Sequence, residues 1–185
     1  MDVTEDVRIL VLLFKMGIQK PSISYSEWTE GCEKLKIDSF ESLQEIVPGL
    51  DTGFLETSQF KSFYKFCFKF NLSGTYKSLD KEVVLALLPM LLKDSHRVPD
   101  DRLESFTKFL ESKEAEYAKI TLDQWTSFLD FCLEVTNLDA FEESTSAWPV
   151  LIDEYVEYLL EQQWKKEIDW RELGSIIFLF ALYRV

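Results

Sequence analysis

Histidine and cysteine carry most nucleophilic, acid–base and metal chemistry in proteins, and this chain contains few of them. It has one histidine, His96, and three cysteines, Cys32, Cys67 and Cys132, with no Cys-x-x-Cys pair. A catalytic triad, a metal triad or a histidine-based acid–base scheme would have to use His96, which we expect to be exposed in a connector before Pro99. The chain also lacks a glycine-rich phosphate loop. The residues available for chemistry therefore favour a binding module over an enzyme, with no cofactor and no metal.

The charge balance narrows the class of partner. Lys and Arg number 20 and Asp and Glu number 33, which gives a net charge of −13 over 185 residues. This charge repels phosphate backbones and anionic lipid, so we expect a basic protein partner, no nucleic acid and no membrane. The widely spaced cysteines are typical of reduced thiols in a cytosolic or nuclear protein. The start of the chain is acidic where a targeting segment would be basic, and no apolar run reaches the ~20 residues of a membrane span.

Apolar residues recur at helical spacing along the chain, which predicts an all-α fold. The first helix should end near Gly17, and Ser26 and Ser39 are expected to cap the next two. The inward faces predicted for these three helices are, in order, Ile9, Leu12, Leu13 and Met16; Trp28, Cys32 and Leu35; and Phe40, Leu43 and Val47.

The middle of the chain predicts helices with aromatic inward faces. The first of these helices contains residues 60–70. On another of its faces a lysine recurs every four residues, at Lys61, Lys65 and Lys69, and we interpret these lysines as a solvated stripe. The next of these helices is a short apolar one between residues 83 and 92, and another opens at Pro99. The inward residues expected for the first and the last of the three are Phe60, Phe63, Tyr64, Cys67 and Phe70, and Leu103, Phe106, Phe109 and Leu110.

Two later helices each begin with an outward carboxylate. Thr121 and Gln124 form a capping-box pattern that should start a helix with Asp123 in its first turn. After an acidic loop, Ala147-Trp148-Pro149 starts another helix, on which Asp153, Glu154 and Glu157 point outward. Each acid by itself would only complement a helix dipole, at about 0.3–1 kcal/mol. Together, the carboxylates of Asp123 and Asp153 around the small Ala147 would also let a basic partner approach closely. The inward residues expected are Trp125, Phe128, Leu129 and Cys132, then Ile152, Tyr155, Val156 and Leu159.

The helix–loop–helix rhythm invites a comparison with the EF-hand calcium loop, which needs oxygen ligands at positions 1, 3 and 5, Gly at 6 and Glu at 12. The best register runs from Asn71 through Ser73 and Thr75 to Glu82. It has Tyr76 where the turn requires Gly, and its early positions carry no carboxylate. We therefore expect a calcium-free relative of that layout or an unrelated helical pair.

Three segments of the chain carry a specific resemblance. They are Asp123-Gln124-Trp125, Leu129-Asp130-Phe131 and above all the run Ala147-Trp148-Pro149-Val150-Leu151-Ile152-Asp153-Glu154-Tyr155-Val156. These segments resemble the defective-in-cullin-neddylation family, and weaker similarity extends upstream through 60–66 and 79–82 to about residue 9. The resemblance implies two degenerate EF-hand-like helical units in one compact domain. Residues 1–160 would form the family's potentiating-neddylation domain, shortened at its N-terminus, and 161–185 a divergent C-terminal helix or tail.

The resemblance also implies a role without catalysis by this chain. Such proteins hold the C-terminal winged-helix region of a cullin and the acetylated N-terminus of the neddylation conjugating enzyme, and thereby act indirectly with a RING subunit. The family's cullin-facing Asp-Ala-Asp patch corresponds to Asp123, Ala147 and Asp153. We expect a monomer in the nucleus and cytoplasm that promotes cullin neddylation by proximity and orientation.

The acetyl-methionine pocket of the family corresponds to Leu12, Ile23, Phe70, Leu87 and Met90. Leu87 replaces an aromatic residue, and the alignment around 16–21 requires a gap. These five residues are also typical of an ordinary core, so a core role and a binding role both stay open.

Two alternatives belong to other functional classes. One is a calcium-independent EF-hand-like adaptor that has lost cullin or conjugating-enzyme binding and serves as an interaction module or competitor. The other is an enzyme with Cys32, Cys67 or Cys132 as a thioester acceptor. It is disfavoured because Cys67 and Cys132 fall on apolar helix faces, where a thiolate is unfavourable.

Overall fold

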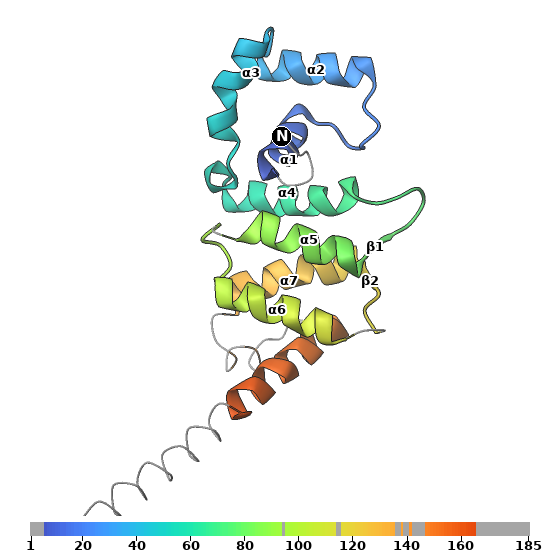
Figure 1. Ribbon diagram of the computed structural model, residues 1–185, viewed down its shortest axis with the longest axis vertical. Coiled ribbons are helices and arrows are strands. Elements are labelled where there is room, and N and C mark those ends of the chain that lie inside the picture. The colour runs from blue at the N-terminus through green and yellow to red at the C-terminus, as the bar shows by residue number, and fades with distance from the viewer. Residues whose placement is uncertain are drawn as a thin grey trace, which may run out of the picture. The chain divides into compact units, whose positions relative to one another are not determined.

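The computed structural model describes residues 6–93, 95–113, 116–135, 138, 141 and 147–165 (Figure 1). The chain divides into two units, residues 1–144 and 145–185. In these described residues the fold is all-α, as predicted, apart from two strands of three residues each. Within the described ranges, no helix is long and apolar enough to cross a membrane.

The first unit opens with three helices and two short 3-10 turns: α1 Val7–Met16, α2 Tyr25–Leu35, α3 Phe40–Ile46, η1 Val47–Leu50 and η2 Thr52–Phe54. Gly17 ends α1 with φ 88°, a left-handed conformation that favours glycine. Ser39 caps α3 as predicted. The predicted Ser26 cap is wrong: Ser24 caps α2, because its hydroxyl accepts from the Glu27 N–H while the Glu27 carboxylate accepts from the Ser24 N–H.

The predicted apolar faces of α2 and α3 are only partly buried: Cys32, Leu35, Leu43 and Val47 are half-buried. The Trp28 and Phe40 side chains are 39% and 68% exposed, and α3 has no buried residue. Gly31 is the buried residue of α2, and a Cβ there would lie 2.8 Å from the Met16 Cβ. The backbone of α2 at Gly31 therefore packs directly against the Met16 side chain of α1, because residue 31 has no side chain of its own.

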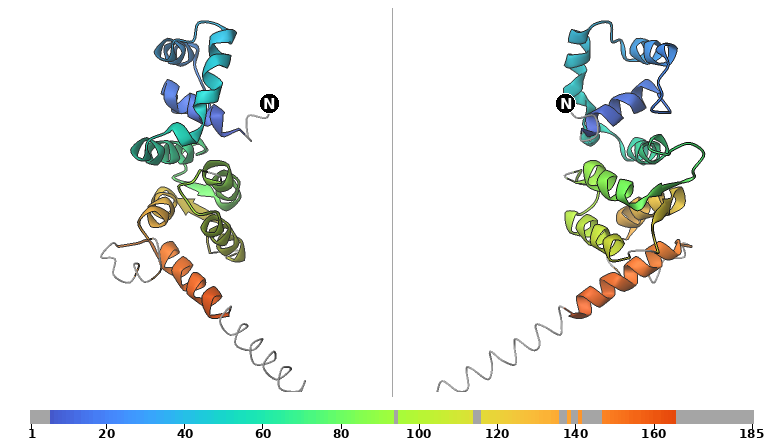
Figure 2. Two further views of the ribbon diagram at one scale, coloured as in Figure 1. Left: turned by 90° about the vertical axis from the view of Figure 1, so that its left-hand side faces the viewer. Right: turned by 45° about the vertical axis from the view of Figure 1, so that its right-hand side comes forward.

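Two helix–loop–strand–helix motifs follow within the first unit. The first motif contains α4 Thr57–Phe70, β1 Ser78–Asp80 and α5 Lys81–Leu92, and the second motif contains α6 Asp100–Ser112, β2 Lys119–Thr121 and α7 Leu122–Glu134. Strands β1 and β2 pair antiparallel, with Leu79 opposite Ile120. Both views of Figure 2 show α5 and α7 beside α4. This is the paired layout of an EF-hand, with Tyr76 exposed in the first loop.

Aromatic side chains fill the core of the first unit. Phe60, Phe63, Tyr64 and Cys67 of α4 are fully buried, as predicted, whereas Phe70 is only half-buried. The Phe106 and Phe128 rings stack with centroids 3.8 Å apart and so join α6 to α7. The predicted inward faces of α6 and α7 are thus confirmed.

The second unit is described as a helix over residues 150–165. Its first bond runs from the Ile152 N–H to the Pro149 carbonyl, 2.8 Å. Ile152, Tyr155 and Val156 are buried as predicted, whereas Leu159 is half-buried. Of the predicted tail 161–185, residues 166–185 lie outside the described residues. The domain boundary at residue 160 therefore stays a prediction.

Candidate functional site

Asp123 stands at the amino end of α7, where the backbone is well fixed. The Thr121 hydroxyl accepts from the Gln124 N–H at 3.3 Å, and the Thr121 N–H donates to the Gln124 side-chain oxygen at 2.9 Å, so the predicted capping box is present. Asp123 follows in the first turn, exposed, and among the described residues it has no ion-pair partner. Its carboxylate is available to a cationic partner and is favoured there by the helix dipole.

Asp130 lies on the same face of α7, seven residues after Asp123. The Lys61 ammonium of α4 lies 2.6 Å from the Asp130 carboxylate, and both side chains are more than a third exposed. One carboxylate of this face is thus already compensated, whereas Asp123 faces solvent without a cation beside it in the described structure.

Ala147 and Asp153 lie at the amino end of the helix 150–165, and both are exposed. Asp153 is the fourth helical residue, and its N–H donates to the Pro149 carbonyl at 3.4 Å. Glu157 is also exposed, one turn further, whereas Glu154 is half-buried. The structure therefore brings Ala147 and Asp153 to one helix end in the second unit, while Asp123 belongs to the first unit.

The five residues expected to form the acetyl-methionine pocket all belong to the first unit. Leu87 is buried at 6% exposure, whereas Leu12, Phe70 and Met90 are half-buried and Ile23 is 36% exposed. The centre of the Phe70 ring lies 5.2 Å from that of the Phe66 ring, and this contact fixes the Phe70 side chain on the side of α4. Four of the five residues thus keep contact with solvent, whereas Leu87 does not.

Two of the three thiols, Cys67 and Cys132, are buried. Burial raises the pKa of the Cys67 thiol well above its usual range and the pKa of Cys132 to about 12. Cys32 is half-buried on α2. In the described part of the chain, no three His, Cys, Asp or Glu side chains cluster in a way that could hold a metal ion.

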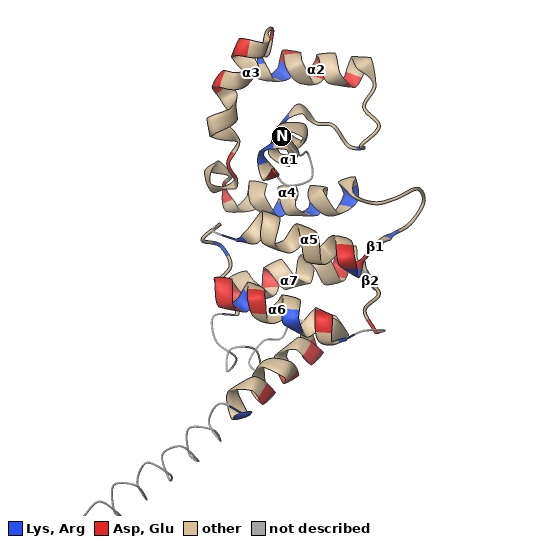
Figure 3. Cartoon of the chain, in the orientation of Figure 1, with Lys and Arg blue, Asp and Glu red and all other residues tan. Residues whose placement is uncertain are grey.

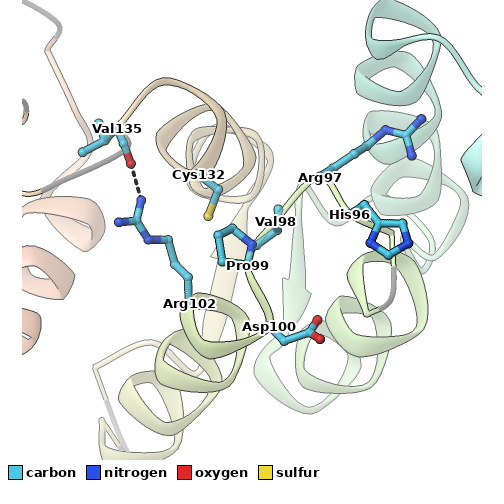
Figure 4. Close-up of a pocket in the computed structure, with 8 residues that line it drawn as sticks. All are labelled: His96, Arg97, Val98, Pro99, Asp100, Arg102, Cys132 and Val135. Atoms are coloured by element: carbon cyan, nitrogen blue, oxygen red, sulfur yellow. Dashed lines mark hydrogen bonds between the residues drawn. The ribbon is translucent and has the colours of Figure 1, made fainter.

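A cavity of about 460 Å³ surrounds the single histidine and reaches Cys132 (Figure 4). His96 is exposed there, as predicted. The guanidinium groups of Arg97 and Arg102 lie on opposite sides of the cavity instead of converging on it.

Arg97 and Arg102 are anchors that the sequence pattern did not reveal. Arg97 donates to the Leu55 carbonyl and lies 4.4 Å from the centre of the Phe60 ring. Arg102 donates to the Val135 carbonyl, and its guanidinium lies 5.0 Å from the centre of the Phe131 ring. The two hydrogen bonds join residues more than thirty positions apart, so no local spacing could have indicated them.

The paired helix–loop–strand–helix motifs of the first unit form a helical domain of EF-hand layout, and exposed carboxylates stand at helix amino ends. A family model described as "Cullin binding" matches residues 42–158, and this chain belongs to that family. The match includes Asp123, Ala147 and Asp153, and of the pocket residues Phe70, Leu87 and Met90.

Curated relatives extend the similarity towards the N-terminus. DCN1-like protein 4 of Danio rerio is 31% identical over 161 residues, which cover 86% of this chain and 55% of the relative. DCN1-like protein 4 of Drosophila melanogaster is 30% identical, with 86% and 62% covered. DCN1-like protein 5 of Bos taurus is 30% identical, with 83% and 63% covered. The chain thus spans less than two thirds of the length of these relatives.

Proposed function

We propose that this protein is a non-catalytic scaffold that promotes cullin neddylation by holding the C-terminal winged-helix region of a cullin together with the neddylation conjugating enzyme. Asp123, Ala147 and Asp153 are the cullin contacts of this proposal. In this proposal the protein is a monomer, acts in the nucleus and cytoplasm, and acts with the RING subunit only indirectly.

One observation carries the cullin contact. All three residues are exposed and fall inside the family match, and neither carboxylate has an ion-pair partner within the described ranges. Carboxylates of this kind form charge-assisted hydrogen bonds with Lys or Arg, and the small Ala147 side chain permits close approach. The net charge of −13 favours association with a basic surface.

The proposed contribution to the reaction is positional. Bringing the modifier-loaded conjugating enzyme next to the cullin raises the effective concentration of the acceptor lysine at the thioester. Cys67 and Cys132 are held as thiols, so the proposal routes no covalent intermediate through either residue.

The proposed second contact is the acetylated N-terminus of the conjugating enzyme, bound by Leu12, Ile23, Phe70, Leu87 and Met90. The partial exposure of four of these residues supports this role, since an incoming methionine side chain would cover apolar surface now in contact with solvent.

Single-turnover transfer of the modifier to a cullin C-terminal domain tests the proposal, with acetylated and unacetylated conjugating enzyme compared. We expect the wild-type chain to accelerate transfer from the acetylated form, and Asp153→Lys to abolish the acceleration. Glu45→Lys makes the same charge change at an exposed position of α3 and should have no effect. Acceleration that survives Asp153→Lys would contradict the assignment of Asp123, Ala147 and Asp153 as cullin contacts. If the folded wild-type chain neither accelerates transfer nor binds a cullin, the adaptor alternative is favoured.

A further inference from the structure

A groove between α1 and α4 is left unused by the proposed function. It encloses about 300 Å³ and is lined by six residues: Phe14, Lys15, Leu55, Ser58, Gln59 and Ser62. It shares no residue with the cullin patch or with the acetyl-methionine pocket. All of its residues belong to the first unit, in which α1 and α4 pack on each other.

The groove has an apolar floor and a polar wall. Phe14 packs edge-on against Phe63, with ring centres 5.6 Å apart, and in a tilted arrangement against Phe66, with ring centres 5.4 Å apart, yet it is only half-buried. The Gln59 side-chain oxygen accepts from the Glu56 N–H at 3.3 Å, which leaves its amide NH₂ free to donate. Such a groove suits one large apolar side chain with polar backbone on either side.

One residue that lines the groove, Lys15, is basic, and two lysines of α4 lie beyond the groove's Ser62. Lys65 follows Ser62 by three positions on α4, so the two side chains are neighbours on the helix surface, and Lys69 continues the row. Figure 3 shows blue bands along α4, and the sequence of the helix contains no Asp or Glu, although an acid, Glu56, stands just before its first residue. Lys61 is occupied by Asp130, whereas Lys15, Lys65 and Lys69 have no ion pair within the part of the chain that the structure describes.

We propose that the α1–α4 groove is a docking site for an acidic peptide segment of a partner protein, with one large apolar side chain seated on Phe14 and Leu55 and carboxylates beside Lys15, Lys65 and Lys69. Charge complementarity identifies this occupant: the three lysines offer cations without carboxylate partners, and hydroxyl and amide groups line the wall. A peptide fits better than a nucleic acid, because three lysines on a chain of net charge −13 form no continuous track for a phosphate backbone.

Fluorescence anisotropy on the full chain tests this site. The probe is a labelled peptide with one phenylalanine flanked by three glutamates on each side, and its matched controls replace the phenylalanine by alanine or all glutamates by glutamine. We expect saturable, salt-sensitive binding of the probe alone. The double variant Lys15→Glu/Lys65→Glu should weaken binding at least about tenfold, as opposed charge pairs become like charge pairs. Lys77→Glu makes the same kind of charge change on the exposed loop 71–77 and should leave binding within about twofold.

Several outcomes would overturn the proposal. Equal affinity of the double variant and the wild-type chain would exclude the groove, and equal affinity of the alanine peptide would exclude the apolar seat. Sedimentation that shows a dimer dissociated by Lys65→Glu would identify a second copy of the chain as the occupant. Tighter binding of a single-stranded oligonucleotide than of the probe would assign the three lysines to nucleic acid. Circular dichroism of each variant confirms that the fold is intact.

Discussion

The rings of Tyr64 and Trp125 lie nearly parallel, 10° apart, with centroids separated by 4.2 Å, and the Trp125 indole N–H donates to the Tyr64 carbonyl at 3.0 Å. This pair joins the middle of α4 to the first turns of α7. Because Asp123 precedes Trp125 by two residues, the same contact fixes the helix end that presents the proposed cullin-binding carboxylate.

The Trp125→Phe substitution tests this anchor. It removes the indole donor and part of a fully buried ring system, so we expect the free energy of unfolding to fall by about 1–3 kcal/mol in urea titrations. Trp164→Phe is the control, because the Trp164 side chain is 69% exposed and its loss should change stability by less than about 0.5 kcal/mol. Equal effects of both substitutions would contradict the anchor.

Two serines near the start of α2 distinguish the observed cap from the predicted one. Ser24→Ala should lower the free energy of unfolding by about 0.5–2 kcal/mol, since it leaves the Glu27 N–H without its acceptor. Ser26→Ala should have an effect near zero. The comparison uses thermal unfolding of the two single variants, and a larger loss for Ser26→Ala would place the cap where the sequence pattern predicted it.

Gly31 permits the close approach of α2 to α1. In Gly31→Ala the new Cβ would lie 2.8 Å from the Met16 Cβ, and overpacking of about 1–3 kcal/mol should outweigh the helix-propensity gain of about 1 kcal/mol. Gly49→Ala serves as the control because no atom lies within 4 Å of its added Cβ. Stabilisation by Gly31→Ala, measured by chemical denaturation, would show that α2 does not pack in this way.

The buried thiols predict an alkaline loss of stability. Cys132 has a pKa of about 12 in the folded chain, above the value of about 8.5 for an exposed thiol. The unfolded state therefore releases a proton that the native state retains, so this contribution to the free energy of unfolding falls as pH rises above about 8.5, with a slope near 1.4 kcal/mol per pH unit. Urea titrations under reducing conditions at pH 8–10 should show a shallower slope for Cys132→Ala than for the wild-type chain. Identical slopes would contradict the burial of this thiol.

Most of the helical fold could be predicted from sequence because its signals are local. Helical spacing placed Phe60, Phe63 and Tyr64 inward, and the Thr121–Gln124 box marked the start of α7. The cap of α2 was also readable, since Ser24 precedes Glu27 by three residues and Ser26 does not have an acid at that spacing.

Other features depend on contacts that no local pattern contains. The three-residue strands β1 and β2 form only because segments about forty residues apart pair with each other. Trp28 and Phe40 lie on apolar helix faces, but spacing shows that a face is apolar and not that something covers it. Asp123 and Asp153 around Ala147 stood out in the sequence as outward carboxylates at helix starts, and the resemblance added the cullin-facing role; the structure adds that each of the three residues is exposed.

Binding of a cullin C-terminal domain, measured by isothermal titration calorimetry, tests the central claim most directly. The account predicts saturable binding by the wild-type chain, loss of about tenfold or more in affinity for Asp153→Lys and for Ala147→Arg, and unchanged affinity for Glu45→Lys. All three variants should keep the wild-type circular dichroism spectrum. Undiminished binding by folded Asp153→Lys and Ala147→Arg would contradict the assignment of this patch as the cullin-binding surface.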